Sequence, residues 1–150
     1  PKVACRVADE LARAGAVVLR NECFTTQGLD VIGVDDLMAR RADPAAALAH
    51  RSGAAALALC HNPDTLDARP WLDYSGFVLA GHTHGGQVYL PFVGRPVVPS
   101  SFGERFAIGH VVEDGRHLFV SPGIGTSIIP VRFLVPPEIS VLTVRDAGGP

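Results

Sequence analysis

The chain has 150 residues, of which 47% are apolar and 19% are charged, and its formal net charge is −2. This is the usual size of one domain with its own core, and the composition excludes a disordered chain, so we expect a single domain over residues 1–150. The thirteen Lys and Arg residues are scattered, which argues against a specific nucleic-acid partner. No apolar run approaches the ~18 residues of a membrane span, so the chain as given is expected to be soluble.

The first half of the chain has the spacing of short helices and strands. Apolar residues recur at helical intervals in residues 3–14, which predicts an amphipathic helix. Residues 16–20 then predict a strand, and residues 23–34 predict a hairpin that turns at a Gln-Gly pair. Asp43 is placed to cap a second helix over residues 44–50, with proline at its first position.

The middle of the chain predicts a βαβ unit. Two continuous apolar runs, residues 54–60 and 76–80, are typical of strands covered on both faces in a parallel sheet, and an Asn-Pro between them opens a helix over residues 63–72. Beyond this unit we expect antiparallel strands at residues 87–91, 105–112, 117–121 and 138–144. The predicted fold class is therefore α/β, with a mixed sheet.

Three histidines follow the two strands of this unit. His61 comes directly after the first strand, and His82 and His84 follow the second in "LAGHTHGGQVYLP". Because the carboxyl ends of neighbouring parallel strands meet at one edge of a sheet, where α/β proteins bind ligands, the three imidazoles should gather there. Residues i and i+2 of an extended segment face one side about 6.5 Å apart, so His82 and His84 can each address one ion of a close pair.

The ordinary alternative is that these histidines are loop residues, since a His-x-His pair alone is a weak signal. Convergence of three at two strand ends favours metal binding. Imidazole suits zinc, iron and manganese alike, so the metal stays open. His50, His110 and His117 have no such partners, and we expect them to be structural or exposed.

Several segments give the chain a specific resemblance to a known family. "HNPD" at 61–64, "LAGHTHGGQVYLP" at 79–91 and "SPGIGTSIIPVRFLVPPEISVLTV" at 121–144 resemble the calcineurin-like metallophosphoesterases, and within them the bacterial YkuE/YaeI-like branch. "NECFTTQGLDVIGVDD" at 21–36 is similar to the same branch. The resemblance therefore covers nearly the whole chain.

The resemblance implies a hydrolase of phosphomonoesters or phosphodiesters that uses two divalent metal ions per complete site, such as Mn, Fe or Zn. By position, His61 and His82 match ligands of the second metal, and His84 matches a ligand of the first. The fold it implies is a four-layer α/β/β/α sandwich, of which this chain is half. The strands after residue 87 would then belong to the second sheet.

Other motifs of that family do not occur in this sequence. An Asp-x-His, a Gly-Asp that supplies the bridging carboxylate, and a Gly-Asn-His are all absent, so the proton-donating histidine has no counterpart and no catalytic residue is assigned. We expect the C-terminal part of a metallophosphoesterase domain, because the chain starts without Met inside a helical pattern. A split protein and a degenerate relative are the alternatives.

An incomplete sandwich would leave apolar surface exposed, so we expect a homo-oligomer or pairing with the missing N-terminal half. The complete protein would be cytoplasmic, or associated with membranes or lipids through that absent half. Two other functions stay open. One is a non-catalytic metal-binding or interaction module completed by a partner chain, and the other is a mononuclear zinc hydrolase with three histidine ligands.

Weaker candidates surround the histidines. Asp36 either reaches the site edge or caps a turn. Asp64 either caps or lies near the positive end of the helix after His61, or it accepts a hydrogen bond from a metal-binding histidine. Arg132 is a candidate phosphate ligand, since guanidinium pairs with phosphate oxygens, and a surface salt bridge is its alternative. Two further candidates for contact with phosphate are Gly85 and Gly86.

Overall fold

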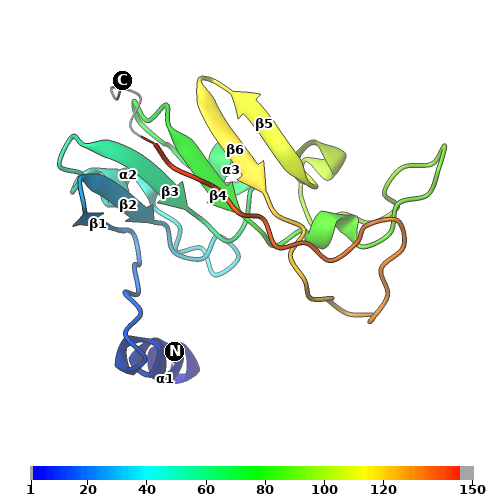
Figure 1. Ribbon diagram of the computed structural model, residues 1–150, viewed down its shortest axis with the longest axis horizontal. Helices are drawn as coiled ribbons and strands as arrows, with labels where there is room; N and C mark the ends of the chain where they lie inside the picture. The colour runs from blue at the N-terminus through cyan, green and yellow to red at the C-terminus, as the bar shows by residue number, and fades with distance from the viewer. Residues whose placement is uncertain (1, 146–150) are drawn as a thin grey trace.

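The computed structural model describes residues 2–145 and contains one sheet of six strands in the order β1-β2-β3-β4-β6-β5 (Figure 1). The strands are β1 Glu22–Thr26, β2 Leu29–Gly33, β3 Ala55–Leu59, β4 Phe77–Ala80, β5 Gly109–Glu113 and β6 Arg116–Val120. The helices are α1 Lys2–Arg13, α2 Pro44–Leu48 and α3 Thr65–Ala68, with single 3₁₀ turns η1 His84–Gly86 and η2 Gly103–Phe106.

The sheet is mixed, as the sequence predicts. Strands β2, β3, β4 and β6 run parallel, and β1 and β5 pair antiparallel at the two edges. The βαβ unit is present as β3, α3 and β4. The expectation that the later strands form a second sheet is wrong for β5 and β6, because β6 pairs with β4 and places His117 opposite Phe77.

Local chemistry explains the elements that were predicted well. Gln27 and Gly28 both have positive φ, 48° and 77°, which is the geometry of a two-residue turn between β1 and β2. Asp43 caps α2 by accepting a hydrogen bond from the Ala46 amide at 3.0 Å, and Pro44 occupies the first turn.

Two predicted elements in the first half are wrong or too long. Residues 16–20 form no strand, and the side chain of Leu19 lies against Gly33 of β2. The helix predicted for residues 63–72 is one turn, α3, which stops where Arg69 adopts an extended conformation at φ −140°. Arg69 precedes Pro70, and the residue before a proline is disfavoured in helical geometry.

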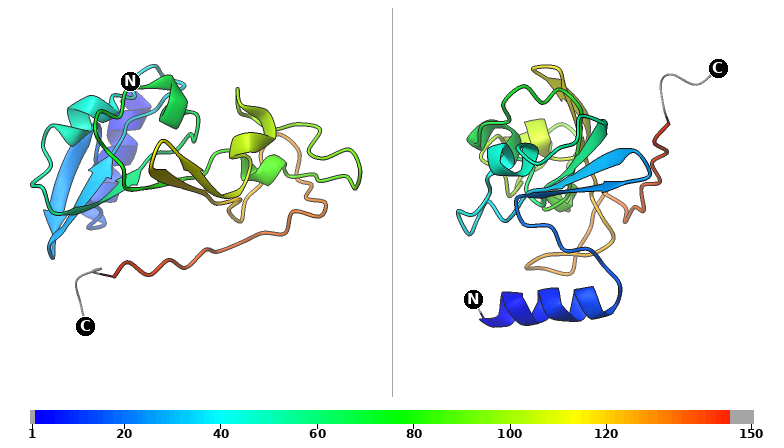
Figure 2. Two further views of the ribbon diagram at one scale, coloured as in Figure 1. Left: turned by 90° about the horizontal axis from the view of Figure 1, so that it is seen from above. Right: turned by 90° about the vertical axis from the view of Figure 1, so that its left-hand side faces the viewer.

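The later strands are also shorter than predicted. Residues 87–91 form only isolated bridges, between Val88 and Phe133 and between Leu90 and Gly94. Residues 105 and 106 belong to the η2 turn and residues 107 and 108 to the bend after it, so that β5 begins at Gly109. Residues 138–144 run without a strand partner, on the side of the sheet away from α2 and α3 (Figure 2).

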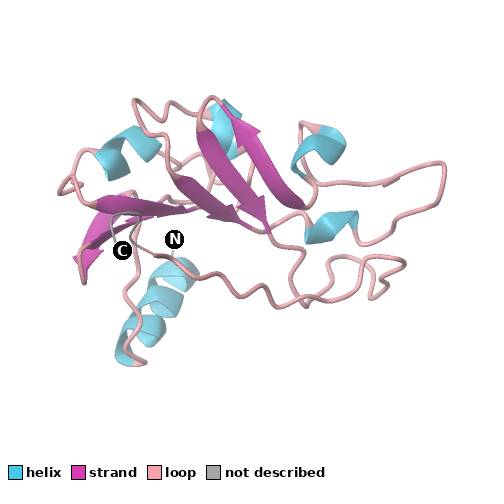
Figure 3. Cartoon of the chain, turned by 45° about the horizontal axis from the view of Figure 1, so that its top comes forward, coloured by secondary structure: helices cyan, strands magenta, loops and turns pink. Residues whose placement is uncertain are grey.

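One face of the sheet carries the core. Helices α2 and α3 lie over this covered face (Figure 3), and alternate residues of the strands point toward it. Trp71 follows α3 into the same core, and its indole nitrogen donates to the Thr65 carbonyl at 2.9 Å. The largest buried apolar side chains are Trp71, Phe106, Ile32, Leu66, Leu118 and Val78.

The opposite, open face is only partly covered. The apolar strand residues Phe24, Leu59 and Phe77 of this face are exposed. The register pairs each of them with another apolar strand residue: Phe24 with Val31, Phe77 with Leu57, and Leu59 with Leu79. Helix α1 stands apart from the sheet (Figure 1), and its stripe of Val3, Val7 and Leu11 is exposed. Among residues 2–145, no helix combines the length and the apolar character needed to cross a bilayer.

Candidate metal centre

The ends of β3 and β4 bring His61 and His82 together. The parallel ladder continues past both strands, since the Cys60 amide donates to Leu79 and the Gly81 amide donates to the His61 carbonyl at 3.1 Å. His82 follows directly, with φ 68°, and its Nδ1 lies 3.2 Å from Nε2 of His61. The two rings meet edge to face at 72°. The tautomers of the two rings decide which of these nitrogens carries a hydrogen.

The surroundings of His82 lower its pKa. Burial is the largest cause, and the neighbouring His61 adds to it, whereas the charge of Asp64 acts in the opposite direction. A lowered pKa keeps the imidazole neutral, and the neutral imidazole is the form that binds a metal ion. The electrostatics of His82 are thus compatible with a ligand role.

His84 lies on the turn that follows this pair, and its ring contacts a different segment of the chain. The segment from His82 to Gln87 is a tight turn rather than an extended strand, because His82, His84 and Gln87 all have positive φ. Thr83 holds the turn by donating its hydroxyl to the Ala107 carbonyl at 2.7 Å. The assumption that His82 and His84 share one side of an extended segment is therefore wrong, and His84 Nδ1 instead contacts the Gly125 carbonyl at 3.3 Å.

The described residues, 2–145, contain no group of three or more His, Cys, Asp or Glu side chains arranged to hold a metal ion. The structure brings together two of the three predicted ligands and places the third on the adjoining turn. The assignment of His61, His82 and His84 to metal stays a prediction.

Asp64 and Asp36 both have partners of their own. The buried Asp64 carboxylate accepts hydrogen bonds from the Ser100 hydroxyl at 2.5 Å and the Ser101 amide at 2.7 Å, so it anchors the loop before η2 rather than capping α3. It has no hydrogen bond to a histidine. Asp36 is exposed and accepts from the Ala39 amide at 3.0 Å, which is the turn-capping role given as its alternative.

Arg132 serves the backbone around the site. Its guanidinium donates to the carbonyls of His84, Pro122, Gly123, Gly125 and Val135, at distances between 2.6 and 3.3 Å. These contacts use the donors of Nε, Nη1 and Nη2, so none is left to bind phosphate in this conformation. Arg132 ties the turn that carries His84 to the 122–125 loop, a role that sequence reasoning missed.

Gly85 and Gly86 are both buried within the turn that carries His84. A Cβ on Gly85 would lie 2.8 Å from the Val135 side chain, and one on Gly86 would lie 3.0 Å from the Val97 carbonyl. Both residues have positive φ, 62° and 73°. The glycines are therefore required by close packing and by the turn geometry.

The fold and the site together define an α/β protein that presents a pair of imidazoles at the carboxyl ends of parallel strands, the edge where such sheets bind ligands. Comparison with known proteins narrows this class. The chain is 35% identical to the metallophosphoesterase YkuE of Bacillus subtilis over 122 residues, which are 80% of this chain and 42% of that protein. It is 31% identical to the phosphodiesterase YaeI of Escherichia coli, over 91% of this chain and 50% of that protein.

A metallophosphoesterase of Aquifex aeolicus is 32% identical over 93% of this chain and 55% of its own length. The chain belongs to the metallophosphoesterase superfamily, a family of hydrolases, and to its YkuE/YaeI-like branch. It spans about half the length of the curated relatives it matches. No family model and no solved structure matches it.

Proposed function

We propose that this chain supplies part of the metal site of a phosphate-ester hydrolase, in which His61 and His82 hold one divalent ion and His84 contributes to a second. The observation that carries the proposal is that His61 and His82 follow the carboxyl ends of adjacent parallel strands, with Nδ1 of His82 3.2 Å from Nε2 of His61. Two nitrogens bound to one ion at about 2.1 Å lie roughly 3.0–3.4 Å apart, so this pair fits a shared ion.

If bound there, the two ions would stabilise negative charge on the phosphate oxygens during in-line displacement at phosphorus. The chain's own residues prepare the ligands for this task. A carbonyl oxygen only accepts hydrogen bonds, so Nδ1 of His84 carries the hydrogen in its contact with Gly125. Nε2 of the same ring is then free to bind an ion. Arg132 holds the carbonyls of His84 and Gly125 in place and so fixes the orientation of that ring.

A complete centre needs groups that this sequence lacks. Three imidazoles carry no charge to offset the repulsion between two dications, so an anionic ligand must bridge them. We propose that another part of the protein, equivalent to the remaining half of the relatives, supplies that carboxylate and the second sheet of a four-layer sandwich. The exposed apolar residues Phe24, Leu59 and Phe77 of the open face support a covering layer of this kind.

Phosphomonoesters and phosphodiesters are the proposed substrates. The name of the YaeI phosphodiesterase supports the diester. A single zinc ion on three histidines has less support, since no cluster of three ligands exists in residues 2–145. A metal-binding module without activity of its own, completed by a partner chain, is favoured by the open face and stays as the second candidate.

The test is metal content after equilibration with Mn, Fe or Zn, measured by elemental mass spectrometry. We expect the double variant His61→Ala/His82→Ala to lose most of the bound metal. The matched control is His110→Ala/His117→Ala, because these two rings have nearly the same nitrogen spacing, 3.1 Å against 3.2 Å, but His117 lies opposite Phe77 at the start of β4, away from the carboxyl edge. Equal metal content in the two double variants would refute the site.

Activity on aryl phosphates and bis-aryl phosphates separates the enzyme from the module. The enzyme predicts metal-dependent hydrolysis that falls in parallel with the metal content of the variants. Metal binding without hydrolysis, in a protein that includes the upstream family motifs, would favour the module.

A further inference from the structure

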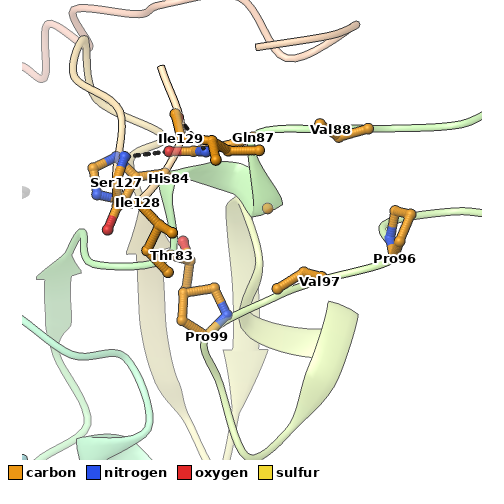
Figure 4. A pocket seen from close by; sticks show the side chains of 11 residues that line it. Thr83, His84, Gln87, Val88, Pro96, Val97, Pro99, Ser127, Ile128 and Ile129 are labelled. Atoms are coloured by element: carbon orange, nitrogen blue, oxygen red, sulfur yellow. Dashed lines mark hydrogen bonds between the residues drawn. The ribbon is translucent and has the colours of Figure 1, made fainter. Parts of the chain in front are cut away.

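A pocket of about 380 Å³ opens beside His84, on the side of its turn away from the sheet (Figure 4). Three segments form it: residues 83–88, 96–99 and 127–129. Most of its wall is apolar and is provided by Val88, Pro96, Val97, Pro99, Ile128 and Ile129. A volume of this size lies within the range of about 300–1,000 Å³ found for small-molecule sites.

Two polar side chains of the wall, Gln87 and Thr83, are already engaged with the protein. Gln87 accepts a hydrogen bond from the Ser127 amide and donates to the Ile129 carbonyl at 3.3 Å, and Thr83 donates to Ala107. An occupant therefore finds few free hydrogen-bonding groups inside. Burying a polar group there without a partner would be unfavourable, so the pocket selects an apolar occupant.

Ile128 marks the mouth of the pocket. It is fully exposed, and its φ of 67° is a left-handed conformation that β-branched residues rarely adopt. Such a conformation costs about 1–3 kcal/mol and tends to be kept where a site needs it. An exposed, strained isoleucine above an apolar pocket is explained if its side chain contacts a ligand.

We propose that this pocket binds the apolar organic group of a phosphate ester while the phosphate lies at the histidine edge. This inference rests on the proposed function for the position of the phosphate. His84 belongs both to the pocket wall and to the candidate metal site, so one ligand can reach both. The substrate class is then an ester with a compact apolar substituent, aryl or branched alkyl, rather than a sugar or polyol ester.

The first experiment compares phenylphosphonate with methylphosphonate by titration calorimetry on the metal-loaded protein. Both probes carry the same charged group, so their difference reports the pocket. Burial of the ring should favour phenylphosphonate by about tenfold or more. Val97→Asp should abolish that preference, and Val93→Asp should leave it intact, because Val93 is equally exposed, 70% against 69%, but does not line the pocket.

A metal-independent measurement separates this proposal from the proposed function. Toluene should shift the NMR methyl signals of Val97 and Ile129 in metal-free protein, and Ile128→Gly should weaken toluene binding while it raises the melting temperature by releasing the strained backbone. Absence of the shifts, or equal affinity for the two phosphonates in protein shown to bind metal, overturns the pocket. Loss of metal binding with toluene binding retained overturns only the metal site.

Discussion

The two faces of the sheet contrast sharply although the same strands build both. On the covered face, Ile32, Val78 and Leu118 are inaccessible to water beneath α2, α3 and η2. On the open face, Leu59 and Phe77 of the same or adjacent strands remain in water. The apolar runs of β3 and β4 lack alternation, which is the pattern of strands covered on both faces. The sequence pattern therefore indicates a sheet that is covered on both faces, and residues 2–145 cover one of them.

A pair of phenylalanines tests this contrast with the largest expected effect. Phe106 of η2 is fully buried against the covered face, and Phe77 of β4 is 51% exposed on the open one. Phe106→Ala should lower the free energy of unfolding by about 3–5 kcal/mol, because it leaves a cavity in a packed core. Phe77→Ala should cost less than about 1 kcal/mol. Urea unfolding at low protein concentration measures both.

The same pair shows whether the open face is covered in solution. If Phe77→Ala costs nearly as much as Phe106→Ala, and the cost grows with protein concentration, a second copy covers the face. Light scattering at micromolar concentration checks this independently. A monodisperse monomer would contradict self-association and leave the proposed second sheet as the cover.

How far the sequence predicts the molecule follows from the range of the interactions involved. Strands β3 and β4 were predicted because their apolar runs are local, and their parallel pairing places His61 beside His82. The orientation of His84 was not predictable in this way. It depends on Thr83 reaching Ala107 and on Arg132 holding the His84 carbonyl, contacts that span 24 and 48 residues.

Other errors had a signal in the sequence. Pro70 lies inside the helix predicted for residues 63–72, and its effect on Arg69 explains why α3 ends at Ala68. By contrast, no local pattern shows that Asp64 would bond Ser100 and Ser101 instead of the helix. Charged side chains near a site are the residues whose partners are set by the tertiary fold.

A buried carboxylate under the covered face gives the second test. Asp30 of β2 is inaccessible to water and accepts hydrogen bonds from Thr25 at 2.6 Å and from the Ser52 amide at 2.7 Å. The hydrogen bond from Thr25 is the largest cause that lowers the pKa of Asp30, and the bonds from Ser52 add to it against the effect of burial. The folded state therefore favours the charged carboxylate.

Because the folded pKa lies below the unfolded one, the stability from Asp30 is present above the unfolded pKa, about 3.9, and is lost as the pH falls through the lower folded pKa. Asp30→Asn should destabilise the protein near pH 7. It should also reduce the fall in the free energy of unfolding at low pH, as measured by urea titrations. Asp73 is the control: its pKa is also lowered, by Arg51, but its side chain is exposed, so Asp73→Asn should change stability little. Equal effects of the two variants would show that burial of the carboxylate does not govern the loss of stability at low pH.

Thiol reactivity measures the same contrast with the smallest effect. Cys23 of β1 lies in register with Ile32 on the covered side, and burial, followed by the charge of Asp30, raises its pKa. Cys5 is exposed on α1. Since the thiolate is the reactive form, an alkylating reagent near pH 8 should modify Cys5 before Cys23, as read by peptide mass spectrometry. Asp30→Asn removes one cause of the raised pKa and should quicken labelling of Cys23 alone. Equal acceleration at Cys5 would instead indicate general loosening of the fold, and the labelling would then report unfolding rather than cover.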